Sequence, residues 1–385
     1  MPLPPPQSVR RILVRSVNWL GDAVMTTPAL LRLRERFPEA RIHLLTPQKL
    51  ALLWEGFSAV DAVMSFGPEE GLLSIARRVR AERFDIGIAF PNSTRTAIEL
   101  WAGGVKHRVG YGGRARMFWL NHRVSRPATQ RGMPKRSLSE IRRRIAHPSL
   151  AETLPPEAHH LHHYLHLVGA VGGSTLPLSP RLAVNETETR AFRERFLSTF
   201  SGHSGPVLGL NAGAEYGPAK RWPEERFAAA AVELAGRTGA AWILFGGAAD
   251  RSLTERVERR MREAGAQVPI ANVAGSTSLR ELMAGLKLCG ALLTNDSGPM
   301  HVAAALGTSV VVPFGSTSPE LTAPGLPGDP QHHLLRVPTP CTPCFQRECP
   351  IDFRCMQGVR VEQAVEALIK ALGRRDPSAQ TLRTS

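Results

Sequence analysis

Long apolar segments are absent from this sequence. No apolar run among its 385 residues approaches the ~20 that a helix needs to cross a bilayer, so the sequence predicts no membrane span. Residues 1–6 lack the basic start and apolar stretch of a secretion signal. We therefore expect a short disordered leader and a cytoplasmic enzyme in reducing surroundings.

Aromatic residues are also few, at 6% of the chain with only three tyrosines, and no recognised nucleic-acid reader motif is present. Nucleic-acid binding therefore ranks last among the functions considered, although the net charge is +15. Residues 1–170 contain 25 Lys+Arg and 13 Asp+Glu, so most of the excess lies in the first half. This asymmetry indicates a nucleic acid, a phosphorylated small molecule, an anionic membrane surface, or only a solvated basic face.

The length fits two domains of ordinary size, and two domains imply a cleft. Strand, turn and helix patterns alternate from residue 11, with a strand at 12–17, a helix at 23–37 and further strands at 41–46 and 85–90. A proline-rich, polar junction at 176–189 precedes a second series that begins with a strand at 206–211. We predict an α/β protein with two Rossmann-like domains, at 10–180 and 190–375, each built on a parallel sheet.

Two segments resist assignment. Residues 112–156 are rich in Arg, Ser, Pro and Gly, and we interpret them as a mobile loop beside the cleft. Residues 159–166 place several histidines at the spacing of one helix face, as a metal-binding helix would. A structural role is favoured, because no carboxylate or cysteine within reach completes a ligand set.

The most informative turn is residues 293–301, where an apolar strand runs through small and polar residues into an apolar helix. The free N–H groups at the helix start suit a phosphate, with the Ser297 hydroxyl as an extra donor and Gly298 allowing close approach. Asp296 accepts only, and would bind sugar hydroxyls instead. Asp296 or Ser297 could alternatively be an ordinary helix cap.

A second turn, residues 211–223, also follows a strand and precedes a helix. Lys220 can supply a point charge to a phosphate, and Gly213 and Ala214 would keep side chains out of its way. Alone this pattern is weak, since Lys-Arg before a helix is often a solvated surface. Two such turns in one domain favour a donor nucleotide in the C-terminal half.

The corresponding turn of the first domain, residues 18–25, has one glycine and is not the G-x-G-x-x-G pattern of a dinucleotide site. That argues against a nicotinamide cofactor. Asp22 remains as a carboxylate able to accept a proton, with electrostatic support of a helix start as its competing role.

Four cysteines lie within fifteen residues as C-x2-C-x4-C-x5-C, namely Cys341, Cys344, Cys349 and Cys355, while Cys289 stands apart. Such spacing suggests Zn²⁺ or an iron–sulfur cluster in a structural role. Uncoordinated thiols in a loop are the alternative.

Three motifs follow one another in this order: NWLGDAVMTTPAL, GAEYGPAKRWP and LLTNDSGPMHVAAALGTSVVVPFGSTSP. With them the chain resembles, over about residues 11–372, glycosyltransferase family 9, the heptosyltransferases of lipopolysaccharide. Within that family it resembles the heptosyltransferase II group most. The CxPCFxRECP segment resembles that group too. The resemblance implies a GT-B fold, the donor ADP-L-glycero-β-D-manno-heptose in the C-terminal domain, and a lipid-linked core acceptor at the N-terminal domain. It implies no catalytic metal.

Site roles follow from the same resemblance. Asp22 matches the general base of an inverting displacement. Lys220 matches a donor contact that acts in catalysis. Further donor contacts are Gly213, Ala214, Asn295, Asp296, Ser297, Gly298 and His301. The implied acceptor is an anionic glycolipid at the cytoplasmic face of the inner membrane. Arg95, just after a strand end, is the first candidate for a contact with it, and Arg114 and Arg116, in a loop, are further candidates.

Three alternatives stay open at this point: heptosyltransferase I or another nucleotide-sugar transferase of the same fold, a nucleotide-binding regulatory module with the cysteines as sensor, and nucleic-acid binding.

Overall fold

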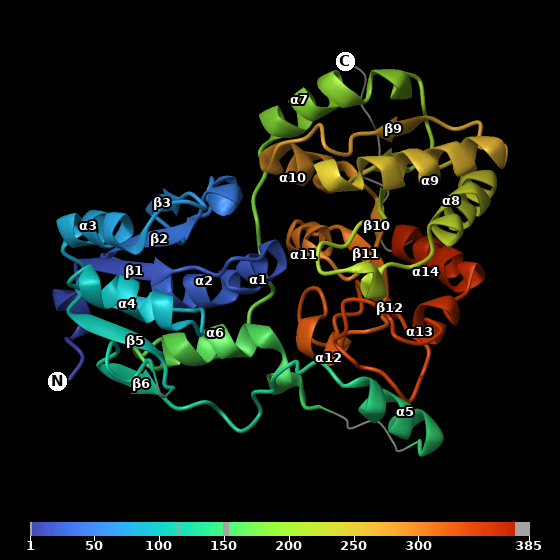
Figure 1. Cartoon of the computed structure of the whole chain (residues 1–385). Coiled ribbons are helices and arrows are strands. Elements are labelled where there is room, and N and C mark those ends of the chain that lie inside the picture. Colours follow the sequence, from blue (N-terminus) through green and yellow to red (C-terminus); the bar gives the residue numbers. More distant parts are fainter. Residues whose placement is uncertain (1, 114, 149–153, 374–385) are drawn as a thin grey trace. The chain divides into compact units, whose positions relative to one another are not determined.

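The computed structural model describes residues 2–113, 115–148 and 154–373. The chain forms two compact units: unit 1 comprises Met1–Arg131 and Pro155–Ala183, and unit 2 comprises Gly132–Leu154 and Val184–Ser385. Each unit contains one six-stranded sheet in which every neighbouring pair of strands is parallel (Figure 1). The predicted α/β architecture with two Rossmann-like parallel sheets is confirmed.

The sheet of unit 1 has the strand order β3-β2-β1-β4-β5-β6. Its strands are β1 (Arg11–Arg15), β2 (Arg41–Pro47), β3 (Ala62–Phe66), β4 (Ile86–Ala89), β5 (His107–Tyr111) and β6 (His122–Val124). Its helices are α1 (Leu20–Met25), α2 (Thr27–Arg36), α3 (Leu72–Glu82), α4 (Thr94–Ala102) and α6 (His160–Gly169). α3 packs against α4 and α2 against α6. Because strand order reverses between β1 and β4, right-handed crossovers place helices on both faces.

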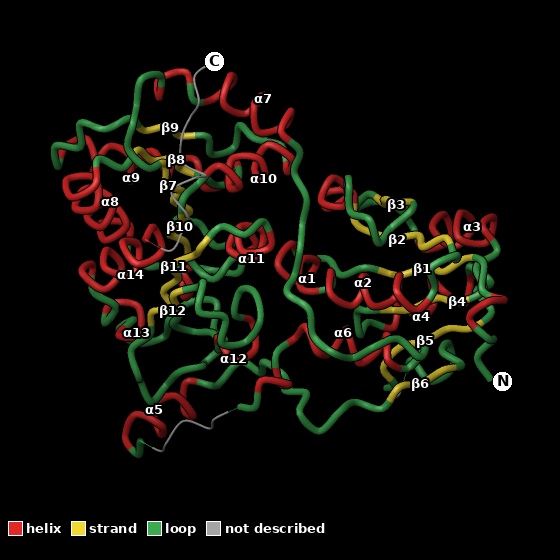
Figure 2. Tube along the Cα trace, turned by 180° about the vertical axis from the view of Figure 1, so that it is seen from behind, coloured by secondary structure: helices red, strands yellow, loops and turns green. Residues whose placement is uncertain are grey.

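The sheet of unit 2 has the order β12-β11-β10-β7-β8-β9. Its strands are β7 (Val207–Asn211), β8 (Ala241–Leu244), β9 (Ile270–Asn272), β10 (Ala291–Thr294), β11 (Ser309–Pro313) and β12 (His333–Leu335). The helices are α5 (Leu138–Ala146), α7 (Glu186–Phe196), α8 (Glu224–Thr238), α9 (Arg251–Glu263), α10 (Leu279–Leu288), α11 (Gly298–Ala305), α12 (Pro319–Thr322), α13 (Arg354–Gln357) and α14 (Val361–Gly373). In both units the strands run between flanking helices (Figure 2).

The central strands are buried along their whole length because helices cover both faces of the sheet. Every residue of β4, β8, β10 and β11 is buried. This explains why these strands read as continuous apolar runs rather than as alternating patterns. In unit 2 the largest buried side chains are Trp222 and Trp242, which belong to one core cluster with α8 and α14.

One predicted helix, residues 23–37, is two helices. α1 ends at Met25 and α2 begins at Thr27. Pro28 has no N–H to donate to the carbonyl of Val24, and the Thr27 hydroxyl donates to that oxygen instead, at 2.8 Å. The break therefore follows from the proline, which the apolar periodicity does not register.

Residues 112–156 contain more structure than the predicted mobile loop. They include β6 and the amphipathic helix α5, which the Ser137 side chain caps by accepting from the N–H of Glu140. Ile141 of α5 is buried against Cys341 and Cys344 of unit 2, so this helix belongs with the second sheet although it lies within residues 10–180. Its apolar face is short, and sequence alone did not separate it from the surrounding arginines.

Among the described helices, none is both long enough and apolar enough to span a bilayer.

A buried ion pair crosses the middle of unit 1. Arg15 at the end of β1 donates to Glu99 of α4 over 2.8 Å, and their side chains are 3% and 0% exposed. Glu99 also accepts from Arg95 at 3.0 Å, and the Arg15 guanidinium lies over the Phe66 ring. Burial lowers the pKa of Arg15, and the charge of Glu99 opposes that shift. The carboxylate therefore compensates the buried cation.

Replacing Glu99 by Ala leaves Arg15 buried without a counter-charge. We expect a loss of about 3–5 kcal/mol in the free energy of unfolding of unit 1, measured by urea denaturation. The matched control is Glu82→Ala, which breaks the half-exposed Arg11–Glu82 pair. That change should cost less than about 1 kcal/mol. Equal effects of the two substitutions would contradict the role of the buried pair.

Candidate functional site

In unit 2 the turns after β7 and β10 meet where the strand order reverses, the usual ligand position in such sheets. Two asparagine side chains tie these turns together. The Asn211 amide donates to Thr294 Oγ1 and Ser297 Oγ, both at 3.2 Å. Asn295 donates to the Ala212 carbonyl at 2.7 Å and accepts from the Trp222 N–H at 2.8 Å. The two predicted turns are thus one hydrogen-bonded structure.

Lys220 and Asp296 form an ion pair inside this structure. Lys220 Nζ lies 2.7 Å from Asp296 Oδ2, and the side chains are 15% and 5% exposed. Thr317, in the turn after β11, donates to the same oxygen at 2.6 Å. Lys220 also lies over the Tyr216 ring, at 5.1 Å from its centroid. Lysine and carboxylate therefore hold each other in a fixed position.

The charge state of Asp296 follows from these neighbours. Burial by itself raises the pKa of this carboxyl, but the charge and hydrogen bond of Lys220, the hydrogen bond of Thr317 and the charge of His301 together lower it below its ordinary value. Asp296 is therefore ionised at neutral pH. A buried carboxylate that accepts only can hold hydroxyl groups of a ligand.

The start of α11 leaves its first N–H groups without a side-chain cap. Ser297 is the N-cap residue, yet it makes no capping hydrogen bond and its hydroxyl accepts from Asn211 instead. Gly298 opens the helix and His301 is buried one turn on. The ordinary cap that the sequence offered as an alternative for Ser297 is not present, so the helix start keeps donors suited to an anion.

Gly213, in the turn after β7, was expected to leave room for a ligand phosphate, but its neighbour is the carboxylate of Asp250. A Cβ at Gly213 would lie 2.5 Å from Oδ2 of Asp250, so this position must be glycine to let that carboxylate approach. Asp250 in turn accepts from the N–H of Gly247 at 3.1 Å. Ala214 is buried, and its carbonyl accepts from Arg221 at 3.3 Å.

In unit 1 the strand order reverses between β1 and β4, and the helices that follow these strands, α1 and α4, carry Asp22 and Arg95 in their first turns. Asp22 lies in the first turn of α1, close enough to Tyr164 of α6 that its charge adds to the burial that raises the pKa of that tyrosine. Arg95 is half exposed, pairs with Glu99 and donates to the Glu70 carbonyl at 3.0 Å. Arg114 lies outside the described residues.

Arg116 is a buried cation of unit 1 to which the described residues supply no carboxylate partner. It is 4% exposed, and its Nε and one Nη have no hydrogen-bond partner. Its side chain donates to the Asn92 side chain, beyond the end of β4, at 3.1 Å. Burial first, and then the charge of Arg126, lower its pKa to about 10. A buried guanidinium with free donors is a position prepared for an anion.

The histidines of residues 159–166 have local partners. His159 caps α6 by accepting from the N–H of Leu161. His166 stacks on Tyr111, whose hydroxyl donates to the His163 carbonyl at 2.8 Å. Burial, followed by nearby positive charges, lowers the pKa of His163 to about 3. The histidines therefore take part in the packing of α6 against β5.

Comparison with known proteins decides the family. The model of glycosyltransferase family 9 (heptosyltransferase) matches residues 72–353. The chain belongs to glycosyltransferase family 9. Lipopolysaccharide heptosyltransferase 2 of Salmonella typhimurium is 30% identical over 82% of this chain and 85% of its own length, and the Escherichia coli protein of that name has the same identity and coverage. The solved E. coli ADP-heptose lps heptosyltransferase II matches with a TM-score of 0.74 at 25% identity, over 94% of this chain and 99% of its own.

The predicted GT-B fold of this family 9 glycosyltransferase is confirmed by that structural match and by the two parallel sheets. Several residues of its site were not predicted. Asn211, Thr317 and Tyr216 contact predicted site residues, and each follows a strand or lies in a turn already singled out. Thr317 could have been predicted from the polar run that follows β11. Since β11 lies next to β10 in the sheet, this run comes close to the turn that contains Asp296.

The four clustered cysteines of this glycosyltransferase line one small cavity together with Ile141 and Ser316. All five cysteines are free thiols. Burial, and then the charges of the other three thiols, raise the pKa of Cys355 to about 12, and burial also raises that of Cys344. Within residues 2–113, 115–148 and 154–373, no group of three or more His, Cys, Asp or Glu is arranged to hold a metal ion. The zinc or iron–sulfur prediction therefore has no support from this structure.

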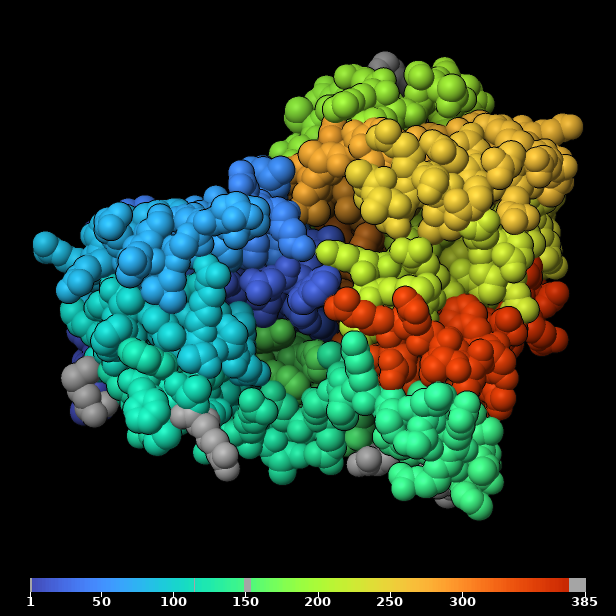
Figure 3. Space-filling model, viewed as in Figure 1, coloured from blue at the N-terminus to red at the C-terminus, as the bar shows by residue number. Residues whose placement is uncertain are grey.

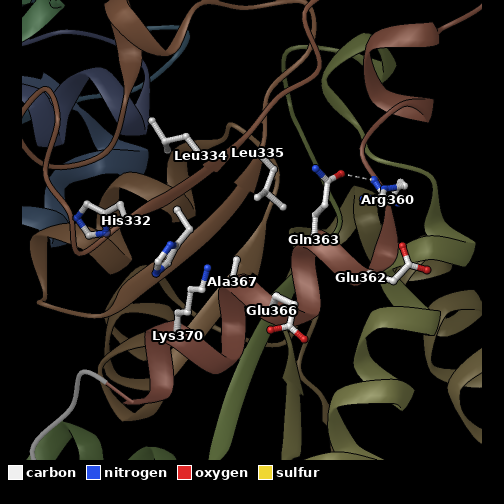
Figure 4. A pocket seen from close by; sticks show the side chains of 10 residues that line it. His332, Leu334, Leu335, Arg360, Glu362, Gln363, Glu366, Ala367 and Lys370 are labelled. Atoms are coloured by element: carbon white, nitrogen blue, oxygen red, sulfur yellow. Dashed lines mark hydrogen bonds between the residues drawn. The ribbon is translucent and has the colours of Figure 1, made fainter.

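A larger cavity, of about 480 Å³, lies elsewhere in unit 2 between β12 and α14 (Figure 4). Its walls include His332, Leu335, Glu366 and Lys370, and the N–H of Arg360 donates to Gln363 at its rim over 2.9 Å. None of the predicted site residues lines it. The candidate site is the polar network at the strand ends.

Substituting Lys220 by Ala should destabilise unit 2, because Asp296 loses its buried counter-charge. We expect a loss of about 2–4 kcal/mol in the free energy of unfolding at pH 7. The pKa of Asp296 is lowered in the native protein, so without Lys220 it should rise, and the loss should shrink as the pH falls and the carboxyl takes up a proton. Urea denaturation between neutral and mildly acidic pH measures this.

The control for this substitution is the double variant Lys220→Ala/Asp296→Asn, which removes both charges. It should be less destabilised at pH 7 than Lys220→Ala alone. A loss that does not depend on pH, or a double variant that is no more stable, would show that the ion pair contributes nothing.

Proposed function

We propose that this protein transfers L-glycero-D-manno-heptose from ADP-heptose to a heptose of the lipopolysaccharide inner core. The observation that carries the proposal is the 30% identity, over 82% of the chain, to two proteins named lipopolysaccharide heptosyltransferase 2. A matching solved enzyme is named for ADP-heptose as well as for lipopolysaccharide. The polar network of unit 2 suits a donor that carries both a diphosphate and sugar hydroxyls.

Donor binding is assigned to the network at the ends of β7 and β10. The uncapped start of α11, with Asn295, Ser297, Gly298 and His301, would hold the pyrophosphate. The carboxylate of Asp296 would accept hydroxyl groups of the heptose. Lys220, held beside it at 2.7 Å, would place its charge on the phosphate side, with Gly213 and Ala214 forming the backbone of the same turn.

The proposed reaction is a single inverting displacement without a metal ion. Asp22 takes the proton from an acceptor hydroxyl as that oxygen forms a bond with the anomeric carbon of the donor heptose. The bond between this carbon and the diphosphate oxygen breaks, and ADP leaves with the electron pair. Lys220 and the N–H groups of α11 would stabilise the charge that grows on the leaving diphosphate.

Acceptor binding is assigned to unit 1 and to an anionic, lipid-linked core oligosaccharide. Arg95 and Arg114 are proposed to contact this oligosaccharide. The unsatisfied donors of buried Arg116 support an anion in the same unit, since a guanidinium without counter-charge is stabilised by one. We further propose that the protein is cytoplasmic and works peripherally at the cytoplasmic face of the inner membrane.

The test of this function is a mass-spectrometric assay of transfer from ADP-heptose to core acceptors that carry either no heptose or one heptose. We expect transfer to the acceptor with one heptose. Transfer only to the acceptor without heptose would indicate a heptosyltransferase I activity. Absence of transfer to both, with intact ADP-heptose binding, would favour a nucleotide-binding regulatory protein.

Asp22→Asn keeps the shape of the side chain but cannot accept a proton. We expect it to lower the transfer rate by roughly 100- to 10,000-fold. The affinity for ADP-heptose, measured by calorimetry, should stay unchanged. Asp352→Asn, which alters an exposed carboxylate paired with Arg354, is the control and should transfer at the normal rate. Normal transfer by Asp22→Asn would remove Asp22 from the mechanism.

A further inference from the structure

Unit 1 carries a cluster of exposed apolar side chains that the proposed reaction does not use. This apolar patch consists of Trp101 at the end of α4 and Met117, Phe118 and Trp119 in the loop between β5 and β6. Phe118 is 74% exposed, Trp101 49% and Met117 46%. The rings of Trp101 and Trp119 contact each other edge to face with centroids 4.7 Å apart. The four residues therefore form one surface feature.

The loop that carries the patch is held from inside. Its inward side chains, Arg116 and Leu120, are buried, and the N–H groups of Trp119 and Leu120 both bond the Arg116 carbonyl at 3.1 Å. Arg108 of β5 donates to the Trp119 carbonyl at 2.7 Å. These bonds hold the loop in a turn that leaves Met117 and Phe118 at the surface. Their exposure is built into the fold of unit 1.

The segment that carries the patch has charge of one sign. Residues 100–131 contain seven Lys+Arg and neither Asp nor Glu. Arg123 and Arg126 are exposed, and neither has a carboxylate partner within the part of the chain that the structure describes. Figure 3 shows residues of this stretch, coloured cyan to teal, at the surface of unit 1. A partner that covers the patch must therefore be apolar at its centre and anionic around it.

We propose that the apolar patch docks unit 1 on an anionic lipid bilayer, with Phe118 and Met117 inserted among the acyl chains and the arginines at the headgroups. Tryptophan is suited to the boundary between headgroups and acyl chains, and cations nearby are attracted by anionic lipids. Single-stranded nucleic acid fits less well, because the edge-to-face contact of Trp101 and Trp119 covers a ring face needed for base stacking. The inference rests on the proposed function in one respect: a lipid-linked acceptor gives the protein a reason to bind there.

The experiment is co-sedimentation of the full-length protein with phosphatidylcholine vesicles prepared with and without phosphatidylglycerol. We expect binding to the anionic vesicles that falls as salt is added. Met117→Ser/Phe118→Ser should lower the membrane partition coefficient by about tenfold or more, as expected for losing the burial of two apolar side chains. The control, Leu73→Ser/Leu176→Ser, alters two exposed leucines of unit 1 outside the patch, 73% and 68% exposed, and should bind like the wild type.

A second measurement separates this inference from the proposed function. Transfer to a soluble acceptor without acyl chains should be the same for the wild type and for Met117→Ser/Phe118→Ser, which also shows that the variant is folded. Transfer to acceptor embedded in anionic vesicles should fall in the variant alone. Vesicle binding that is equal in wild type and variant, or a patch that is needed for binding nucleic acid or protein instead, would overturn the proposal. Wild type that binds vesicles but transfers no heptose would refute only the proposed function.

Discussion

One carboxylate joins the three turns that make up the candidate site of unit 2. Asp296 follows β10, Lys220 follows β7 and Thr317 follows β11, and the last two both bond Asp296 Oδ2. A buried charge is stable only if its surroundings compensate it, so the position of Asp296 constrains the other two side chains. The asparagines Asn211 and Asn295 add to this constraint by donating to the Ser297 hydroxyl and to the Ala212 carbonyl in the same turns. The result is a rigid polar surface at the strand ends before any ligand binds.

Unit 1 uses charge in a different way. Its buried Arg15 is compensated by Glu99, which also holds Arg95, so this cationic pair belongs to the protein's own structure. Arg116 has no such partner and keeps unsatisfied donors in a buried position. Arg15 and Arg95 thus share one carboxylate within unit 1, whereas Arg116 keeps donors that the described residues do not satisfy. Under the proposed function, an anionic acceptor would satisfy these donors without displacing a carboxylate of unit 1.

Family membership and site geometry contribute different parts of the functional proposal. The relatives supply the reaction and the donor, and the network around Asp296 supplies a physical reason why a diphosphate sugar fits unit 2. The cysteine cavity contributes neither, since no metal-holding group is found among the described residues and Cys341 and Cys344 pack against Ile141 of α5. The cavity lies where α5 packs against the loop that contains Cys341 and Cys344.

The α/β class, the two parallel sheets and the turns at 211–223 and 293–301 could be predicted from the amino-acid sequence. Strands buried on both faces and helix starts have local sequence patterns that make this possible. The sequence did not reveal α5 in unit 2, the break before Thr27, or the strands at or next to the sheet edges, β3, β5, β6, β9 and β12, where the local apolar signal is weak and packing decides. Three features became visible only in the folded chain: the Lys220–Asp296 ion pair, the approach of Asp250 to Gly213, and the unsatisfied donors of Arg116. They could not be predicted, because they join residues distant in sequence or depend on the direction in which a loop faces.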